Sequence, residues 1–279
     1  MAGTIPAPAG AHPTASQPSK SRIELPDCEL EAVQIAPRAR GLPTLVFLHE
    51  GLGSIELWKD FPAALAARTG CGALIFSRHG NGFSSLLVRP RDPQYMHAEA
   101  LRVLPRLLDA LEIEAPILVG HSDGASIALI YAGEYPHAVR GLVLEAPHVF
   151  VEELSVHSIA AIKHQYETTD LRDRMAPYHR DVDRTFYGWN DIWLLPEFCD
   201  WNIEAYVTRI RAPVLAIQGL EDEYGTPAQL ESIVRRAPVP VDRLILARCG
   251  HVPHRDRRPV VEGAIGSWVE SQLPKPFAN

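Results

Sequence analysis

Residues 115–131, APILVGHSDGASIALIY, decide the fold of the chain. An apolar run ends at the pentapeptide G-H-S-D-G, and apolar residues at helical spacing follow it, so the stretch predicts a strand, a sharp turn and a helix. Ser122 lies at the turn. Side chains two residues before and after it would collide, and Gly120 and Gly124 occupy both places. The pattern therefore predicts a serine hydroxyl exposed at the carboxyl edge of a sheet.

The composition is that of a globular chain able to bury a sizeable core, with 279 residues, 46% of them hydrophobic and 22% charged. A formal net charge of −7 argues against a nucleic-acid partner, because no basic stripe is present to neutralise phosphates. The four cysteines form no C-x-x-C pair, which favours reduced thiols in a cytoplasmic protein over a disulfide framework or a zinc site. No apolar run approaches the roughly 18 residues of a membrane span, so we expect no membrane partner.

The first 21 residues are rich in Ala, Pro and Ser. They lack the basic start and the continuous apolar segment of a secretory signal. We therefore expect residues 1–21 to be a disordered tail.

Strand and helix patterns alternate from residue 22 onward, which predicts parallel strands, right-handed crossovers and an open, doubly wound α/β sheet. The ligand site of such a sheet lies beyond the carboxyl ends of its strands. The expected core comprises residues 22–147 and 211–279. The expected strands are residues 23–25, 30–35, 42–49, 73–76, 116–119, 141–144, 213–217 and 243–247, and the expected helices outside the central stretch are residues 55–68, 96–111, 226–236 and 259–273.

The alternation pauses over residues 148–210, a segment that is helical in pattern, dense in charge and rich in aromatic residues. Because the segment leaves and rejoins the sheet at strand ends, we expect it to form a helical lid over the site. Most of its aromatic side chains are expected to pack the lid onto the core, and the others to line an apolar substrate pocket. The candidates for substrate contact are His148, Trp189 and Trp193.

Five loop motifs, in order along the chain, resemble those of the α/β-hydrolase superfamily of serine hydrolases. The resemblance covers the chain from about residue 22 onward. It implies a mostly parallel eight-stranded sheet, a lid between the sixth and seventh core strands, and a catalytic triad that needs neither cofactor nor metal. The motifs are H-x-G-x-G-S at 49–54, S-R-x-G-x-G-x-S at 77–84, G-H-S-D-G at 120–124, G-x-x-D at 219–222 and G-H-x-P at 250–253.

A serine hydroxyl is a poor nucleophile at neutral pH and needs a base within hydrogen-bonding reach. His251 is the candidate base, because it follows an expected strand at the catalytic edge. His254 is the alternative, three residues further on. We expect His49 and His121 to brace loops rather than to transfer protons.

The histidine base in turn needs a carboxylate on its other ring nitrogen. Glu221, Asp222 and Glu223 compete for this role in one acidic turn. The resemblance implies Asp222 as the acid, and Glu145, after the preceding strand, is the alternative.

A tetrahedral intermediate needs two backbone N–H donors. We expect them from Asp123, the residue after the nucleophile, and from Gly51 in the loop after the strand at 42–49. Glu50 stands where the family usually has glycine. A carboxylate there would repel a developing oxyanion, so we expect Glu50 to point away, into a salt bridge with Arg78.

Asp123 has two interpretations. Its carboxylate complements the positive end of the helix that follows the turn, which is worth a few tenths to ~1 kcal/mol. The S-D-G arrangement is also similar to that of valacyclovir-hydrolase-like (biphenyl-hydrolase-like) enzymes, in which the Asp binds an α-amino group. That resemblance would make Asp123 a substrate-binding residue.

Together these features predict a serine hydrolase, monomeric or homodimeric, that cleaves a carboxylic ester or related small acyl substrate through an acyl-enzyme. The same triad also supports carbon–carbon bond hydrolysis, enol-lactone opening and amino-acyl ester hydrolysis. A catalytically silent small-molecule receptor with this fold is the alternative from a different class.

Overall fold

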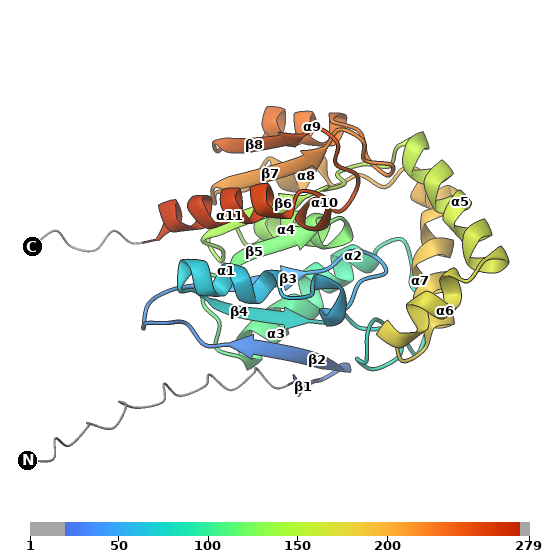
Figure 1. The fold of residues 1–279 in the computed structure, drawn as a ribbon, viewed down its shortest axis with the longest axis horizontal. Coiled ribbons are helices and arrows are strands. Elements are labelled where there is room, and N and C mark those ends of the chain that lie inside the picture. Colours follow the sequence, from blue (N-terminus) through green and yellow to red (C-terminus); the bar gives the residue numbers. More distant parts are fainter. Residues whose placement is uncertain (1–19, 274–279) are drawn as a thin grey trace, which may run out of the picture.

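The computed structural model describes residues 20–273, which form one eight-stranded sheet with helices on both faces (Figure 1). The strand order is β1-β2-β4-β3-β5-β6-β7-β8. The last six strands of the chain are parallel, whereas β1 and β2 form an antiparallel hairpin at one edge. The strands are β1 (Lys20–Leu25), β2 (Cys28–Ile35), β3 (Thr44–Leu48), β4 (Gly72–Phe76), β5 (Ile117–His121), β6 (Gly141–Glu145), β7 (Val214–Gly219) and β8 (Val241–Leu246). The expected doubly wound, mostly parallel sheet is confirmed.

Helices cover both faces of the sheet, which is why β4 to β7 are buried along their whole length. In Figure 1, α1 (Phe61–Thr69) and α11 (Arg258–Gln272) lie in front of the sheet, and they share one apolar cluster. The opposite face packs against α3 (Leu104–Ala110), α4 (Asp123–Glu134) and α9 (Ala228–Arg236). Two separate cores therefore hold the sheet rigid from either side.

Two expectations need correction. The helix expected at 55–68 is broken into a 3-10 turn, η1 (Ile55–Trp58), and α1. Lys59 between them has a φ of 54°, and Pro62 in the first turn of α1 lacks the N–H that a continuous helix would use. β1 begins at Lys20, so residues 20–21 of the expected tail are strand, and residues 1–19 lie outside the described residues.

The helix expected at 96–111 is present and contains a π-helical turn, η2, between α2 and α3. This segment precedes β5 and packs against α4, the helix that follows Ser122. Its bounds are α2 (Tyr95–Ala98), η2 (Glu99–Val103) and α3.

A helical insertion separates β6 from β7, within the range expected for the lid. Figure 1 shows α5, α6 and α7 standing together at the end of the sheet, away from α1 and α11. The last helix of the insertion, α8, packs against α4, where a side chain at Gly133 would approach the backbone of Tyr206 to 2.5 Å. The insertion comprises α5 (Glu153–Thr168), α6 (Leu171–Met175), η3 (Ala176–Tyr178), α7 (Val182–Trp193), η4 (Pro196–Phe198) and α8 (Glu204–Val207). None of the helices in residues 20–273 is long and apolar enough to cross a membrane.

Candidate active site

Ser122 lies in a strained turn between β5 and α4. Its φ of 54° and ψ of −118° fall in a backbone region that residues other than glycine rarely adopt. A Cβ at Gly120 would lie 2.5 Å from the carbonyl oxygen of Gly124, and a Cβ at Gly124 would lie 1.9 Å from that of Leu48 in β3. Both obstacles are backbone atoms that cannot move aside. The requirement for glycine on both sides of Ser122 is therefore confirmed.

The structure brings Ser122, His251 and Asp222 together at the carboxyl edge of the sheet. His251 Nε2 lies 2.9 Å from Ser122 Oγ, and its Nδ1 lies 2.8 Å and 3.0 Å from the two carboxylate oxygens of Asp222. Because the carboxylate accepts the Nδ1 proton, Nε2 is left free to accept the proton of the serine hydroxyl. The three side chains thus form one hydrogen-bonded line.

Asp222 is held as a carboxylate by the groups around it. Its Oδ1 accepts backbone N–H groups from Tyr224 and Gly225 at 2.8 Å and 3.2 Å, and its Oδ2 accepts the Gln218 amide at 2.7 Å. Burial alone would raise the pKa of Asp222, but the hydrogen bond and charge of His251, with the Tyr224 N–H, bring that pKa below its ordinary value. Asp222 can therefore orient His251 and stabilise its charged form.

The alternative base and the alternative acid hydrogen-bond each other. His254 Nδ1 lies 2.9 Å from Glu145 Oε2, and the backbone N–H of His254 donates to the same oxygen at 3.0 Å. The His254 ring packs against both Trp58 and Phe61, with ring centroids 4.7 Å and 5.3 Å away. This pair is thereby committed to the core beneath the site. The sequence contained no signal that His254 and Glu145 would pair with each other, since both residues follow strands at the edge of the sheet where the site lies.

Glu50 does not form the expected salt bridge. Its carboxylate lies 3.5 Å from His121 Nδ1, whereas Arg78 donates to the Glu50 backbone carbonyl at 2.9 Å. The carboxylate that faces Arg78 is that of Asp123, at 3.5 Å. His121 Nε2 lies 2.6 Å from the carbonyl oxygen of His251, so it carries a proton. His121 therefore connects the two loops that hold Glu50 and His251, as expected for a bracing residue.

The charges of Glu50 and His121 reinforce each other. Burial alone would lower the pKa of His121, but the neighbouring Glu50 carboxylate raises it above its ordinary value of 6.5. Burial works in the opposite direction on Glu50, yet the His121 ring, 3.5 Å from its carboxylate, brings the pKa of Glu50 below its ordinary value of 4.5. His121 and Glu50 thus each favour the charged form of the other, and the His121 ring lies 5.2 Å from the ring of the histidine base His251.

Gly51 and Asp123, the expected oxyanion donors, line the same cavity as Ser122. A Cβ at Gly51 would lie 2.0 Å from the indole nitrogen of Trp189 on α7, so a side chain at position 51 would displace that ring. Asp123 is the first residue of α4, where backbone N–H groups have no partner within the helix. Both residues therefore stay candidates for oxyanion binding in the cavity that Ser122 lines.

The Asp123 carboxylate is already engaged within the protein. It is fully buried, and its Oδ2 accepts the Tyr95 hydroxyl proton at 2.6 Å and faces Arg78. Burial and the Asp123 charge raise the pKa of Tyr95 well above its ordinary value, so Tyr95 stays a donor. Trp193 Nε1 in turn donates to the Tyr95 hydroxyl at 3.1 Å. This geometry favours a structural role for Asp123, although its Oδ1 makes no hydrogen bond within residues 20–273.

The cavity above Ser122 has a volume of about 250 Å³ and brings together residues of the core and of the insertion. The sequence predicted His148, Trp189 and Trp193 at this cavity and missed the other lining residues of the insertion. The missed residues of α5 recur at i, i+4 and i+7, a helical spacing that could have identified one face of that helix. They are Ser155, Ile159 and Ile162, and further missed lining residues are Leu52, Glu223, Tyr224, Val252 and Arg255.

His148 is a neutral group in this cavity. Burial and the nearby charge of His251 lower its pKa to about 4. Its ring lies 5.2 Å from that of Trp193 and 5.7 Å from that of His251. His148 can therefore contact a substrate without adding charge.

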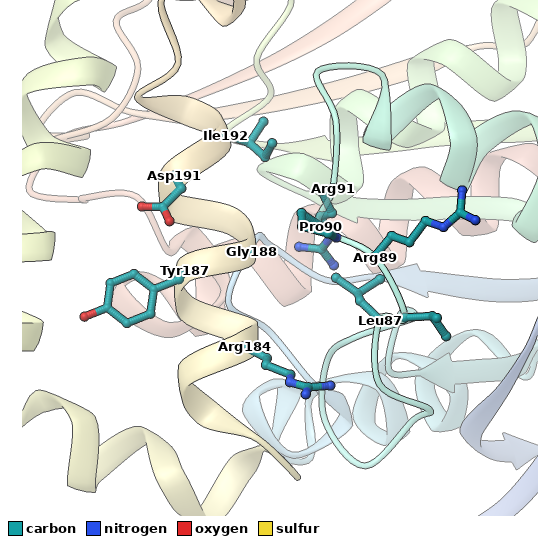
Figure 2. A pocket seen from close by; sticks show the side chains of 10 residues that line it. Leu87, Arg89, Pro90, Arg91, Arg184, Tyr187, Gly188, Asp191 and Ile192 are labelled. Atoms are coloured by element: carbon teal, nitrogen blue, oxygen red, sulfur yellow. The ribbon is translucent and has the colours of Figure 1, made fainter.

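A second cavity, of about 350 Å³, lies on the other side of α7 (Figure 2). It opens between the loop at 87–91 and the α7 face that carries Arg184, Tyr187, Gly188 and Asp191. Figure 2 shows Arg184 pointing toward the loop, with Tyr187 and Asp191 pointing away from it. None of the three hydrogen-bonded residues of the site lines this cavity. Within residues 20–273, no group of three or more His, Cys, Asp or Glu side chains could hold a metal ion.

The family model described as alpha/beta hydrolase fold matches residues 43–191, more than half of the chain. The chain therefore belongs to the α/β-hydrolase fold family. Over 281 residues it is 23% identical to the proline iminopeptidase of Lactobacillus delbrueckii subsp. bulgaricus, a match that covers 86% of this chain and 94% of that protein.

Two further likenesses are more limited. Over 118 residues the chain is 31% identical to the (Lyso)-N-acylphosphatidylethanolamine lipase of Bos taurus, covering 42% of this chain and 34% of that protein, so the match spans about a third of the lipase. The crystal structure of the enol-lactonase from Burkholderia xenovorans superimposes with a TM-score of 0.70 at 17% identity, covering 89% of this chain and 99% of that one. This second likeness shows the fold alone.

Replacing Glu50 by Gln should destabilise the protein in a pH-dependent way. Because the folded-state pKa of His121 is raised, its pairing with Glu50 stabilises the fold fully below the ordinary pKa of 6.5, and this stabilisation is lost as pH rises through the raised value. We expect the melting temperature of Glu50→Gln to fall further below that of the unmodified protein at pH 6 than at pH 9. Thermal melts at the two pH values measure this, and equal differences would contradict the pairing.

Proposed function

We propose that the protein is a serine hydrolase that cleaves a carboxylic ester or related small acyl compound through an acyl-enzyme. The observation that carries the proposal is the hydrogen-bonded line from Asp222 through His251 to Ser122, which ends in a cavity. Nucleophile, base and orienting acid are thus within reach of one another before any substrate binds. Membership of a hydrolase fold family supports the same reaction class.

In the proposed reaction, Ser122 Oγ attacks the carbonyl carbon as its proton passes to His251 Nε2. The carbonyl oxygen becomes an oxyanion that accepts the N–H groups of Gly51 and Asp123. The intermediate then expels the alcohol, which takes the proton from His251, and the acyl group remains on Ser122. Water repeats the sequence and releases the acid. Asp222 holds the His251 ring and stabilises its charged form in both halves.

The cavity lining combines apolar side chains with the charged side chains of Glu50, Glu223 and Arg255, and its apolar part supports a largely apolar acyl group. Ile159, Ile162 and Trp189 supply apolar surface from the insertion, and His148 is neutral at physiological pH. The same groups would accommodate an enol lactone or a carbon–carbon hydrolase substrate, which differ in the leaving group and use the same first step.

Amino-acyl ester hydrolysis is the second candidate, because Asp123 lines the cavity and its Oδ1 makes no hydrogen bond within the described residues. Arg78 and Tyr95 already balance the charge of this carboxylate. We therefore expect an isovaleryl ester to be hydrolysed with a higher kcat/KM than the matching valyl ester, which differs only by the α-amino group. A preference of tenfold or more for the valyl ester would instead establish amine recognition.

A fluorophosphonate probe tests the proposed function directly. We expect stoichiometric labelling of the protein, located at Ser122 by mass spectrometry and absent in Ser122→Ala, because only an activated serine reacts with the probe. Absence of labelling in the unmodified protein would refute the proposal and favour the silent receptor.

The labelling rate also distinguishes the two candidate acids. Asp222→Asn should slow labelling by up to about 10⁴-fold, since the amide favours the wrong tautomer of His251. Glu145→Gln is the matched control, because Glu145 serves His254 and should leave the labelling rate within a few-fold of the original. The reverse ranking would assign the acid to Glu145.

A further inference from the structure

The loop at 77–84, one of the five motifs of the sequence, makes no direct contact with Ser122 in the proposed reaction. Its side chains instead hold the backbone of the loop that carries Gly51. Asn81 Nδ2 donates to the carbonyl oxygens of Gly51 and Gly53 at 2.9 Å and 3.2 Å, and Arg78 Nη2 donates to that of Glu50 at 2.9 Å. Three backbone carbonyl groups of this loop are therefore held by side chains of the loop at 77–84.

The Glu50 carbonyl is the decisive contact, because it belongs to the same peptide unit as the Gly51 N–H. It accepts hydrogen bonds from Arg78 Nη2, from His49 Nδ1 at 2.6 Å and from the Gly53 N–H at 3.1 Å. In a trans peptide the C=O and N–H bonds point in opposite directions. Holding the carbonyl oxygen against Arg78 and His49 consequently turns the Gly51 N–H to the opposite side.

His49 is a donor to this carbonyl for a simple reason. Its Nε2 accepts the Arg78 backbone N–H at 2.9 Å, so in the neutral ring the proton must be on Nδ1. Burial and the Arg78 charge keep the pKa of His49 well below its ordinary value, which keeps the ring neutral. The Arg78 backbone N–H thus fixes the tautomer of His49, and the Arg78 charge helps to keep the ring neutral.

Burying the charged Arg78 side chain in this position is unfavourable for folding. Its side chain is fully buried, and its Nε and Nη1 atoms make no hydrogen bond within residues 20–273. Its one ion-pair partner there is Asp123, at 3.5 Å, whose backbone N–H is the second oxyanion donor of the proposed reaction. A buried charge with unsatisfied donors carries a desolvation penalty and is poor evidence for a stabilising role. The buried position of Arg78 is better explained by its contacts to Glu50 and Asp123, the two residues whose peptide units carry the proposed oxyanion donors.

We propose that Arg78 is a positioning residue: its guanidinium holds the Glu50 carbonyl so that the Gly51 N–H faces the oxyanion of the reaction. The proposal rests on the proposed function, since it assigns a role in that reaction. A hydrogen bond to the carbonyl also polarises the peptide unit and strengthens its N–H as a donor. Arg78 acts through this peptide unit and does not touch the substrate.

The test compares Asp123→Asn with the double variant Asp123→Asn/Arg78→Met, because both avoid an unpaired buried carboxylate and they differ only in the guanidinium. Active sites are counted by fluorophosphonate labelling, and thermal melts verify folding. The measured quantities are kcat, KM and the inhibition constant of a trifluoromethyl ketone, whose adduct with Ser122 carries an oxyanion. Arg180→Gln is the control, since Arg180 binds the Phe83 carbonyl of the same loop at an exposed position.

We expect the double variant to lose about 10²–10³-fold in kcat per active site relative to Asp123→Asn, with a parallel loss of trifluoromethyl ketone affinity, because one oxyanion donor is misdirected. KM should change by less than about threefold, and Arg180→Gln should match the unmodified protein. A merely structural Arg78 would lower the melting temperature or the fraction of active sites and leave the ketone affinity per site unchanged. That result would overturn the proposal.

The failure of this inference can be told apart from the failure of the proposed function. If the unmodified protein labels at Ser122 but the double variant retains kcat and ketone affinity, only the role of Arg78 is wrong. If the unmodified protein does not label, the hydrolase proposal itself fails. Asp123→Asn/Arg78→Leu, which likewise lacks any donor to the Glu50 carbonyl, takes the place of the double variant if that variant does not fold. The same losses in kcat and ketone affinity are then expected.

Discussion

The site depends on one close backbone contact, in which Gly124 at the start of α4 meets the carbonyl oxygen of Leu48 at the end of β3. β3 and β5 are neighbouring parallel strands, with Leu48 opposite Gly120, so the loop after β3 and the turn after β5 leave the sheet side by side. Only glycine lets them approach this closely. Ser122 and Gly51 line the same cavity for this reason, although 70 residues lie between them in the sequence.

Acid–base pairs that are buried, apart from the partly exposed Glu50, surround this contact and keep the loops in place. Each pair joins side chains from different strand ends, so breaking one would leave an uncompensated charge in the interior. The arrangement exchanges some folding stability for loops that need not reorganise when charge develops on a substrate. The pairs are Asp222 with His251, Glu50 with His121, Asp123 with Arg78, and Glu145 with His254.

The sequence predicted the strand–turn–helix at Ser122, the order of the sheet-forming segments and the loops that carry Gly51, Asp222 and His251, because glycine spacing and apolar periodicity are local properties. It could not choose partners for charged groups. Arg78 lies 28 residues from Glu50, and only the packed structure shows that it binds the Glu50 carbonyl and faces another carboxylate. The break at Lys59 was also missed, since apolar periodicity continues across it while the backbone does not.

These contacts organise the proposed site around an oxyanion before substrate binds. A crystal structure of the protein phosphonylated at Ser122 would place an oxyanion analogue in this site. We expect the phosphoryl oxygen about 2.7–3.1 Å from the amide nitrogens of both Gly51 and Asp123, with the Glu50 carbonyl still bound to Arg78. A phosphoryl oxygen directed away from both amides, or a Gly51 peptide turned so that its carbonyl faces the cavity, would contradict this organisation of the site.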